Sequence, residues 1–266
     1  MSQKLHRIFQ SARKDHQCLF LPYICLGYPD YDSSLLSAKA ALRAGAAALE
    51  LGIPFSDPIA DGPTLQEATK ISLEQGTRLS DVFHFIKDLR KDGFIQPLLV
   101  MSYLNLIEQM GWKNFAVELS KAGGDGTIVP DLSLQQFDKV KPLLKGKDLS
   151  LIPFVAPTSN PDRMKKADAQ GAPFLYYVSV TGVTGARKEL PAQLFSTLKR
   201  MKALLKTPVV VGFGISTPEQ AAKVGKSADG VIIASALIQV ISKTKRGMIG
   251  KAVEQFCGKV LKALKK

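Results

Sequence analysis

Short apolar runs alternate with helical patterns along the whole chain. The apolar runs are rich in Val, Ile, Leu and Phe and mostly lack a regular alternation of apolar with polar residues. Such runs are typical of strands that are buried on both faces of a parallel sheet. They predict eight strands, over Leu19–Leu26, Ala47–Leu51, Pro97–Tyr103, Gly126–Pro130, Leu149–Val155, Pro173–Val178, Pro208–Gly212 and Asp229–Ile233.

Amphipathic segments lie between the predicted strands. Apolar residues have helical spacing in Val82, Phe85, Ile86 and Leu89, in Phe115 and Leu119, in Leu134 and Phe137, and in Leu194, Leu198 and Met201. Ser80 and Asp81 precede the first of these segments and supply its expected N-cap. Eight strands alternating with helices favour an α/β fold, a (β/α)8 TIM barrel, with a doubly wound open sheet as the alternative. Because no linker or change of composition divides the chain, we expect residues 1–266 to form a single domain.

Composition narrows the class of protein. Hydrophobic residues make up 45% and charged residues 22% of the chain, which allows a large core and argues against disorder. The N-terminus is polar and charged, and no stretch approaches the roughly 18 consecutive apolar residues of a membrane span. The three cysteines and three histidines show no paired or ligand-like spacing. We therefore expect a cytoplasmic protein with reduced thiols and no structural metal.

The chain is strongly basic, with 36 Lys and Arg against 23 Asp and Glu and a net charge of +13. Much of the excess lies near the C-terminus: from Lys223 onward the chain has ten Lys and Arg residues and only two acidic residues, Asp229 and Glu254. A basic surface can bind nucleic acid or an anionic membrane, but no aromatic residues are interleaved with these lysines. A solvated basic C-terminal helix is the favoured interpretation, with a smaller contribution from attraction of a phosphorylated substrate.

A carboxylate interrupts one of the predicted buried strands. Glu50 lies in the apolar run from Ala46 to Leu51. Burial there raises the pKa of a carboxyl group towards neutrality, which is what a general acid or base needs. A salt bridge to a lysine of the barrel is an equally good interpretation of the strand alone.

The loop after this strand carries a second acid. Asp57 and Asp61 stand among Pro54, Pro58 and Pro63, and proline limits the loop to few conformations. Asp61 is placed to reach over the barrel mouth towards Glu50, and two acids in different surroundings resemble a split acid/base pair. The alternative is a solvated turn in which the aspartates only cap the backbone.

Three loops rich in Gly and Ser follow the last three predicted strands. They are Ser179–Gly185, Gly212–Ser216 and Ala234–Ala236, and the last of them opens a helix. Glycine lets backbone N–H groups approach an anion, and a helix N-terminus adds a favourable dipole. In barrels of this type, phosphate sites favour the loops after strands seven and eight. The three loops together predict a phosphate site.

The run Leu49–Gly62 resembles the signature of the tryptophan synthase alpha chain family. The resemblance covers essentially the whole chain and extends to Leu26–Asp30, Pro130–Leu132, Ser179–Gly185 and Gly212–Ser216. It implies a lyase of L-tryptophan biosynthesis that cleaves indole-3-glycerol phosphate to indole and glyceraldehyde 3-phosphate. The reaction is a retro-aldol cleavage that needs no cofactor in this subunit.

The resemblance also implies roles for individual residues. Glu50 matches the catalytic acid/base that protonates the ring carbon bearing the glycerol chain and helps to deprotonate the adjacent hydroxyl. Asp61 matches the acid that holds the indole N–H and stabilises the positive charge on the ring. The substrate-binding positions are Tyr23, Met101 and Ile128 as apolar walls, together with Tyr176 and Thr184. The phosphate-binding positions are Gly185, Gly214, Ala234 and Ser235.

Members of this family work with a beta subunit. The resemblance implies an alpha-beta-beta-alpha complex in which the beta subunit holds pyridoxal phosphate and receives indole through a tunnel. The loops Ile53–Asp61 and Val180–Leu190 are then expected to close over substrate and to face the partner.

The chain departs from the family pattern at three positions. Cys25 stands in place of a threonine near the barrel mouth, which is expected to alter packing around the indole. Ala234 stands in place of a glycine, and its N–H still serves phosphate unless the turn requires a positive φ. Ser133 stands in place of a proline, with small expected consequence.

Other functions stay open at this point. A stand-alone lyase would release free indole without a beta subunit, and a different barrel enzyme would act on another phosphorylated substrate. A silent regulator that only activates a beta subunit is disfavoured because Glu50 and Asp61 are both present. A basic nucleic-acid-binding barrel is the least favoured.

Overall fold

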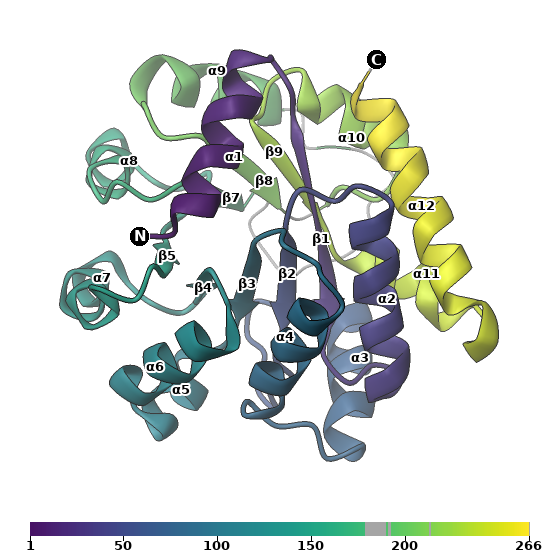
Figure 1. Ribbon diagram of the computed structural model, residues 1–266. Helices are drawn as coiled ribbons and strands as arrows, with labels where there is room; N and C mark the ends of the chain where they lie inside the picture. Colours follow the sequence, from purple (N-terminus) through teal and green to yellow (C-terminus); the bar gives the residue numbers. More distant parts are fainter. Residues whose placement is uncertain (179–189, 191–192, 213, 266) are drawn as a thin grey trace.

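The computed structural model describes residues 1–178, 190, 193–212 and 214–265. Within this part of the chain the strands are β1 (Leu19–Cys25), β2 (Leu49–Gly52), β3 (Leu98–Met101), β4 (Gly126–Ile128), β5 (Ser150–Ile152), β6 (Phe154–Val155), β7 (Leu175–Val178), β8 (Val209–Gly212) and β9 (Gly230–Ile233). All neighbouring strands are parallel, in the order β5-β4-β3-β2-β1-β9-β8-β7-β6. Helices connect them and surround the sheet (Figure 1).

The sheet closes into a barrel at Pro153. β5 and β6 stand at opposite ends of the strand order, yet only this residue separates them in the chain. The Pro153 carbonyl accepts the Tyr176 N–H at 3.0 Å, and proline has no N–H to donate on the other side. The single strand predicted over Leu149–Val155 is therefore wrong in detail, because the segment bends here into two short strands. The predicted (β/α)8 barrel is confirmed.

Helices surround the barrel and cover its amino-terminal end. They are α1 (Gln3–Lys14), α2 (Tyr31–Arg43), α3 (Pro63–Glu74), α4 (Asp81–Lys91), α5 (Leu104–Met110), α6 (Trp112–Ala122), α7 (Leu134–Val140), α8 (Pro161–Asp168), α9 (Leu194–Leu204), α10 (Pro218–Gly225), α11 (Ser235–Ser242) and α12 (Ile249–Leu264), with short 3-10 turns η1 (Lys141–Leu144) and η2 (Arg246–Met248). All the segments with helical spacing are confirmed as helices. The helix α4 has its N-cap at Ser80, as expected, but the Ser80 side chain makes no capping hydrogen bond.

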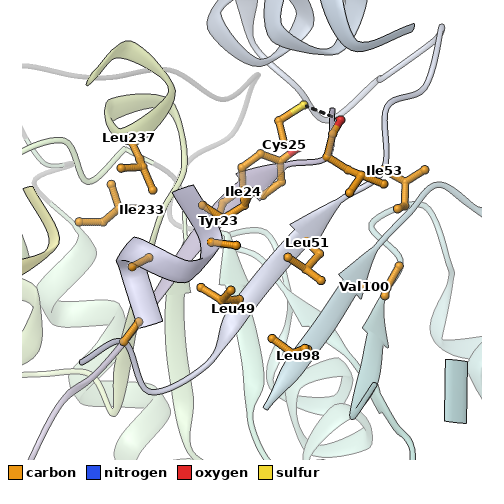
Figure 2. Packing of buried hydrophobic residues seen from close by; sticks show 14 of the residues in the cluster. Tyr23, Ile24, Cys25, Leu49, Leu51, Ile53, Leu98, Val100, Ile233 and Leu237 are labelled. Carbon is orange, nitrogen blue, oxygen red and sulfur yellow. Dashed lines mark hydrogen bonds between the residues drawn. The ribbon is translucent and has the colours of Figure 1, made fainter. Parts of the chain in front are cut away.

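The strands face two separate apolar layers. Leu49 and Leu51 of β2 lie beside Leu98 and Val100 of β3 in the layer under the helices (Figure 2). Side chains alternate along a strand, so Glu50 between the two leucines points into the barrel. The barrel interior is filled from several strands by Leu21, Leu99, Ile128, Ile152, Val210 and Ile232. Each fully buried side chain of this size contributes about 1.5–3 kcal/mol.

Helix α1 covers the amino-terminal end of the barrel. Its Leu5 and Phe9 are buried in the interior cluster, and the Phe9 ring lies 5.0 Å from the Phe174 ring. The Ser2 backbone N–H donates to the Ser150 hydroxyl at 2.9 Å, which ties the start of α1 to β5. The amino-terminal end is thereby sealed, and functional side chains have room at the carboxyl ends of the strands.

The C-terminal helix α12 packs along α2 and α10 (Figure 1). Val253 and Cys257 are buried against the barrel, whereas Lys251, Lys259 and Lys262 are exposed. The expectation of a solvated basic helix is confirmed. Among the described residues, no helix is both long and apolar enough to cross a membrane.

Candidate active site

A cavity opens at the carboxyl ends of the strands. It is lined by Tyr23, Glu50, Asp61, Leu65, Met101, Tyr176, Gly214, Ile215, Ile232, Ala234 and Ser235. The two carboxyl groups come from β2 and the loop after it, and the Gly/Ser turns come from the loops after β8 and β9. This is the form expected of a small-molecule site with a few placed polar groups.

Glu50 is buried in the barrel interior, with an exposed fraction of 3%. The Tyr176 hydroxyl donates a hydrogen bond to its carboxylate, while Oε2 has no hydrogen-bond partner. Burial, followed by the nearby charge of Asp61, raises the Glu50 pKa to about 8, although the bond from Tyr176 opposes the rise. No cation from the described part of the chain pairs with Glu50, so the predicted alternative of a lysine salt bridge finds no support there.

Asp61 reaches the same cavity from the loop after β2, and it too is 3% exposed. The start of α3 holds it in place, because the Gln66 side chain donates to the Asp61 carbonyl at 2.9 Å. Burial raises the Asp61 pKa to about 6, and a hydrogen bond from the Tyr103 hydroxyl limits the rise. The alternative of a solvated capping turn is wrong for Asp61, since its side chain is enclosed.

The two acids differ in protonation near neutral pH. With a pKa of about 8, Glu50 holds its proton at pH 7, and with a pKa of about 6, Asp61 is ionised. A neutral carboxyl group can donate a proton, and an adjacent carboxylate can stabilise positive charge on a bound ring. The cavity therefore suits acid/base chemistry on a substrate that becomes cationic during reaction.

Two tyrosines flank the acids and need glycine beside them. A Cβ at Gly52 would stand 2.0 Å from the Tyr23 hydroxyl, and one at Gly212 would stand 2.3 Å from the Tyr176 hydroxyl. Both contacts are too short for any side chain other than hydrogen. These glycines therefore leave room for the tyrosine rings of neighbouring strands. Phe154 stacks on Tyr176 with ring centroids 4.7 Å apart, which fixes the ring that bonds Glu50.

The other region of the cavity is formed by backbone turns. Gly214 has a φ of +80°, a conformation that favours glycine. Ser235 is the first residue of α11 and lines the cavity, so the N-terminus of this helix, with the positive end of its dipole, lies at the cavity. Ala234 has a φ of −109°, so this turn does not require the positive φ that would favour glycine. The condition under which alanine was expected to be tolerated here is met. The arrangement suits an anionic group.

Most predicted site residues that the structure describes line this one cavity. They are Tyr23, Glu50, Asp61, Met101, Tyr176, Gly214, Ala234 and Ser235. Ile128 does not: it pairs with Met101 in the sheet, and its side chain is enclosed within the interior cluster. Its role as an apolar wall for the indole stays a prediction. Thr184 and Gly185 lie outside the described residues.

Sequence reasoning missed three apolar lining residues. Leu65 lies in the first turn of α3, directly after the acidic loop, and Ile215 follows Gly214. Ile232 lies on β9, two positions before Ala234. The alternation of side chains along a strand could have identified Ile232 as facing the same way as Ala234. Nothing in the sequence marks the other two.

The departures from the family pattern have local structural consequences. Burial raises the pKa of the Cys25 thiol to about 12, and this thiol hydrogen-bonds with Thr69 and Tyr23 rather than lining the cavity. Ser133 forms a capping box with Gln136 at the start of α7, so it has a clear role in place of proline. In the described part of the chain, no group of three His, Cys, Asp or Glu residues is arranged to hold a metal ion.

Known proteins share both the sequence and the fold. The family model of the tryptophan synthase alpha chain matches residues 9–265. The tryptophan synthase alpha chain of Chloroflexus aggregans is 41% identical over 240 residues, which cover 90% of each chain. That of Aquifex aeolicus is 39% identical over 249 residues, which cover 93% of this chain and 95% of the relative.

Solved structures agree with these relatives. A chain of Mycobacterium tuberculosis tryptophan synthase superposes with a TM-score of 0.90 at 31% identity, covering 100% of both chains. The tryptophan synthase alpha chain of Legionella pneumophila superposes with a TM-score of 0.88 at 32% identity, covering 100% of this chain and 98% of that one.

Proposed function

This chain belongs to the tryptophan synthase alpha chain family, and from that membership we propose how its cavity performs the family's reaction. The chain is an enzyme subunit, a lyase of tryptophan biosynthesis that cleaves indole-3-glycerol phosphate into indole and glyceraldehyde 3-phosphate. The proposal concerns which residues carry the reaction and which partner the chain requires.

Glu50 acts as the general acid and then as the base. Its protonated carboxyl group transfers a proton to the indole ring carbon that bears the glycerol chain. The resulting carboxylate accepts the proton of the adjacent hydroxyl, and the carbon–carbon bond breaks as that hydroxyl becomes the aldehyde. Glu50 ends the cycle protonated, as it began. The pKa of about 8 supports the first step, because the proton is present at neutral pH.

Asp61 stabilises the charge that this protonation creates. Adding a proton to the ring carbon places positive charge on the indole nitrogen, and a carboxylate that accepts the N–H lowers the energy of that state. The pKa of about 6 keeps Asp61 ionised while Glu50 is protonated. Charge stabilisation inside a buried site is worth more than in water because the dielectric is low.

The remaining lining residues orient the substrate. Tyr23 and Met101 provide apolar walls for the indole, and Tyr176 holds Glu50 beside the glycerol chain. Gly214, Ala234 and Ser235 bind the phosphate at the start of α11, with Thr184 and Gly185 contributing from the loop after β7. The acids and the phosphate-binding turns come from different strand ends and line one cavity, which supports this orientation.

One observation carries the proposal. Two carboxyl groups, each 3% exposed, line the same cavity, and no described cation pairs with Glu50. Leaving a buried acid without such a partner costs stability, so a role in chemistry accounts for it better than a structural role.

The chain works in an alpha-beta-beta-alpha complex with a beta subunit that holds pyridoxal phosphate, whereas the alpha subunit itself needs no cofactor. The structural similarity to a tryptophan synthase supports the partner. The loops Ile53–Asp61 and Val180–Leu190 would face the partner and couple the two sites. Residues 1–266 act as one domain in the cytoplasm, which the three free thiols favour.

The test is indole release from indole-3-glycerol phosphate by the purified chain, alone and with its beta subunit. We expect slow release alone and a sharp rise on mixing. High activity alone would favour the stand-alone lyase, whose site is the same. Absence of cleavage under both conditions would overturn the assigned substrate.

A further inference from the structure

Tyr103 touches two successive residues of the acidic loop, although it belongs to another strand end. It follows β3, stands at the N-cap of α5 and is 1% exposed. Its hydroxyl accepts the Ala60 backbone N–H at 3.1 Å. The same hydroxyl hydrogen-bonds the Asp61 carboxylate.

The position of the hydroxyl proton follows from these two contacts. The Ala60 N–H can only donate, so the tyrosine oxygen accepts there. The Asp61 carboxylate can only accept when ionised, so the Tyr103 O–H donates to it. Burial and the nearby carboxylate raise the pKa of Tyr103, so the donor stays protonated.

Tyr103 is held through its ring and through the backbone of the residue that follows it. Phe55 stacks on it with centroids 5.1 Å apart and an interplanar angle of 28°. The next residue, Leu104, donates its N–H to both oxygens of Asp131 at 2.9 and 3.1 Å. Asp131 follows β4, so the loops after β2, β3 and β4 are joined through Tyr103. These contacts restrain the Tyr103 hydroxyl, which can therefore hold the Asp61 carboxylate in one position.

We propose that Tyr103 is a positioning residue for Asp61, and that its hydroxyl holds the carboxylate and the adjacent backbone in the geometry that meets the indole nitrogen. This inference rests on the proposed role of Asp61. Tyr103 acts through that carboxylate and does not line the cavity itself.

The other groups that face Asp61 are themselves acids. They are Glu50 on β2, Tyr23 and Cys25 on β1, and Tyr176 on β7. Burial raises the Asp61 pKa, and the hydrogen bond from Tyr103 opposes that rise. Removing that bond therefore raises the pKa and loosens the carboxylate, and no neighbouring described cation compensates.

The experiment compares Tyr103→Phe with the wild type in the complex with the beta subunit. Phenylalanine keeps the ring that stacks on Phe55 and removes only the hydroxyl. We expect kcat to fall about tenfold with little change in KM, because one hydrogen bond to a charged group is lost. The acid limb of the kcat/KM profile moves up by roughly one pH unit, the shift that such a bond sustains.

Two further variants separate this inference from its premise. When Tyr103→Phe is combined with Asp61→Asn, we expect little further loss of kcat beyond that of Asp61→Asn alone, because both changes remove the same interaction. Normal rates for Asp61→Asn would defeat the proposed role of Asp61 itself. A slow Asp61→Asn with an unchanged rate and pH profile for Tyr103→Phe would overturn the inference alone.

Controls address folding and generic effects of losing a hydroxyl. Tyr31→Phe removes a tyrosine hydroxyl that donates to Asp88 at 3.0 Å and does not line the cavity, so it is expected to leave kcat and the pH profile unchanged. Phe55→Leu keeps the Tyr103 hydroxyl but removes its stacking partner. It moves the acid limb in the same direction by less, which gives a second test if Tyr103→Phe folds poorly. If the acid limb of the kcat/KM profile moves in neither Phe55→Leu nor Tyr103→Phe, the proposal is contradicted.

Discussion

Asp125 and Glu50 lie at opposite ends of the barrel and are equally buried, each with an exposed fraction of 3%. At the amino-terminal end, Asp125 pairs with Arg90 at 2.7 Å and accepts the Leu98 N–H at 3.0 Å. The Ser2 hydroxyl lies 3.2 Å from its other oxygen. At the carboxyl end, Glu50 has one tyrosine hydroxyl, and its Oε2 has no partner.

The contrast shows that burial alone does not decide what a carboxylate does. Burial raises the pKa of Asp125 as well, but four surrounding donors and cations oppose the rise. Arg90 is itself satisfied by the carbonyls of Phe94, Gln96 and Gly123. Asp125 therefore holds the fold together, whereas Glu50 keeps a proton that it can give away.

Glu50→Gln provides the largest test of this contrast. It removes the transferable proton while keeping the shape, so kcat should fall by about 10³-fold or more. Stability should not fall. The folded-state pKa of about 8 lies above the ordinary value of 4.5. The contribution of Glu50 to the free energy of unfolding is therefore fully present below pH 4.5 and is lost as the pH rises through 8.

Glutamine escapes that loss, so the melting temperature of Glu50→Gln at pH 8 should exceed that of the wild type by several degrees. Indole release and thermal melts at pH 5 and pH 8 measure both effects. Turnover within tenfold of the wild type would remove Glu50 from the mechanism.

Arg90→Ala should give the opposite outcome. Removing the guanidinium leaves Asp125 buried without its main partner, which costs about 3–5 kcal/mol of the free energy of unfolding. The kcat of the folded fraction should stay near the wild-type value. Urea unfolding and turnover measure the two effects separately. Lys121→Ala breaks an exposed pair with Glu118 and serves as the control, with a change below about 1 kcal/mol.

Asp61→Asn should lower kcat by about 10²-fold, because a neutral amide stabilises less charge on the indole nitrogen. The fold should be retained, since Asp61 is not part of an ion pair among the described residues. Steady-state kinetics and circular dichroism of the same preparation check this. A rate close to that of the wild type would contradict the role.

The pH profile should reflect both acids. Activity needs Glu50 protonated and Asp61 ionised, so kcat/KM should fall as pH rises through about 8 and as pH drops through about 6. The ascending limb should disappear in Asp61→Asn. A profile that is flat from pH 5 to 9 would show that neither group titrates in the free enzyme.

Ser235→Ala should have the smallest effect. It removes one hydroxyl at the start of α11 and leaves the backbone N–H groups, so phosphorylated ligands should bind about tenfold more weakly. The probe is an indolylalkyl phosphate without the glycerol hydroxyls, which cannot be cleaved. Ser242→Ala at the other end of the helix should leave its affinity unchanged. Unchanged affinity in Ser235→Ala would move the phosphate site elsewhere.

Much of the barrel could be predicted from the pattern of apolar and polar residues along the chain. Apolar runs predicted the strands, because a strand buried on both faces must be apolar along its length. The interruption of such a run by Glu50 identified a candidate acid, and the glycine-rich strand ends predicted an anion site. The bend at Pro153 could also have been predicted from the sequence, because proline has no N–H to donate to a neighbouring strand.

The sequence by itself determined the barrel, its strand ends and the candidate acids, since each depends on residues close together in the chain. Only the tertiary structure decided that Asp125, rather than Glu50, has a described ion pair. It also brought Tyr103 to Asp61. These outcomes depend on contacts between segments far apart in sequence, and such contacts set the burial and the hydrogen bonds that fix a pKa.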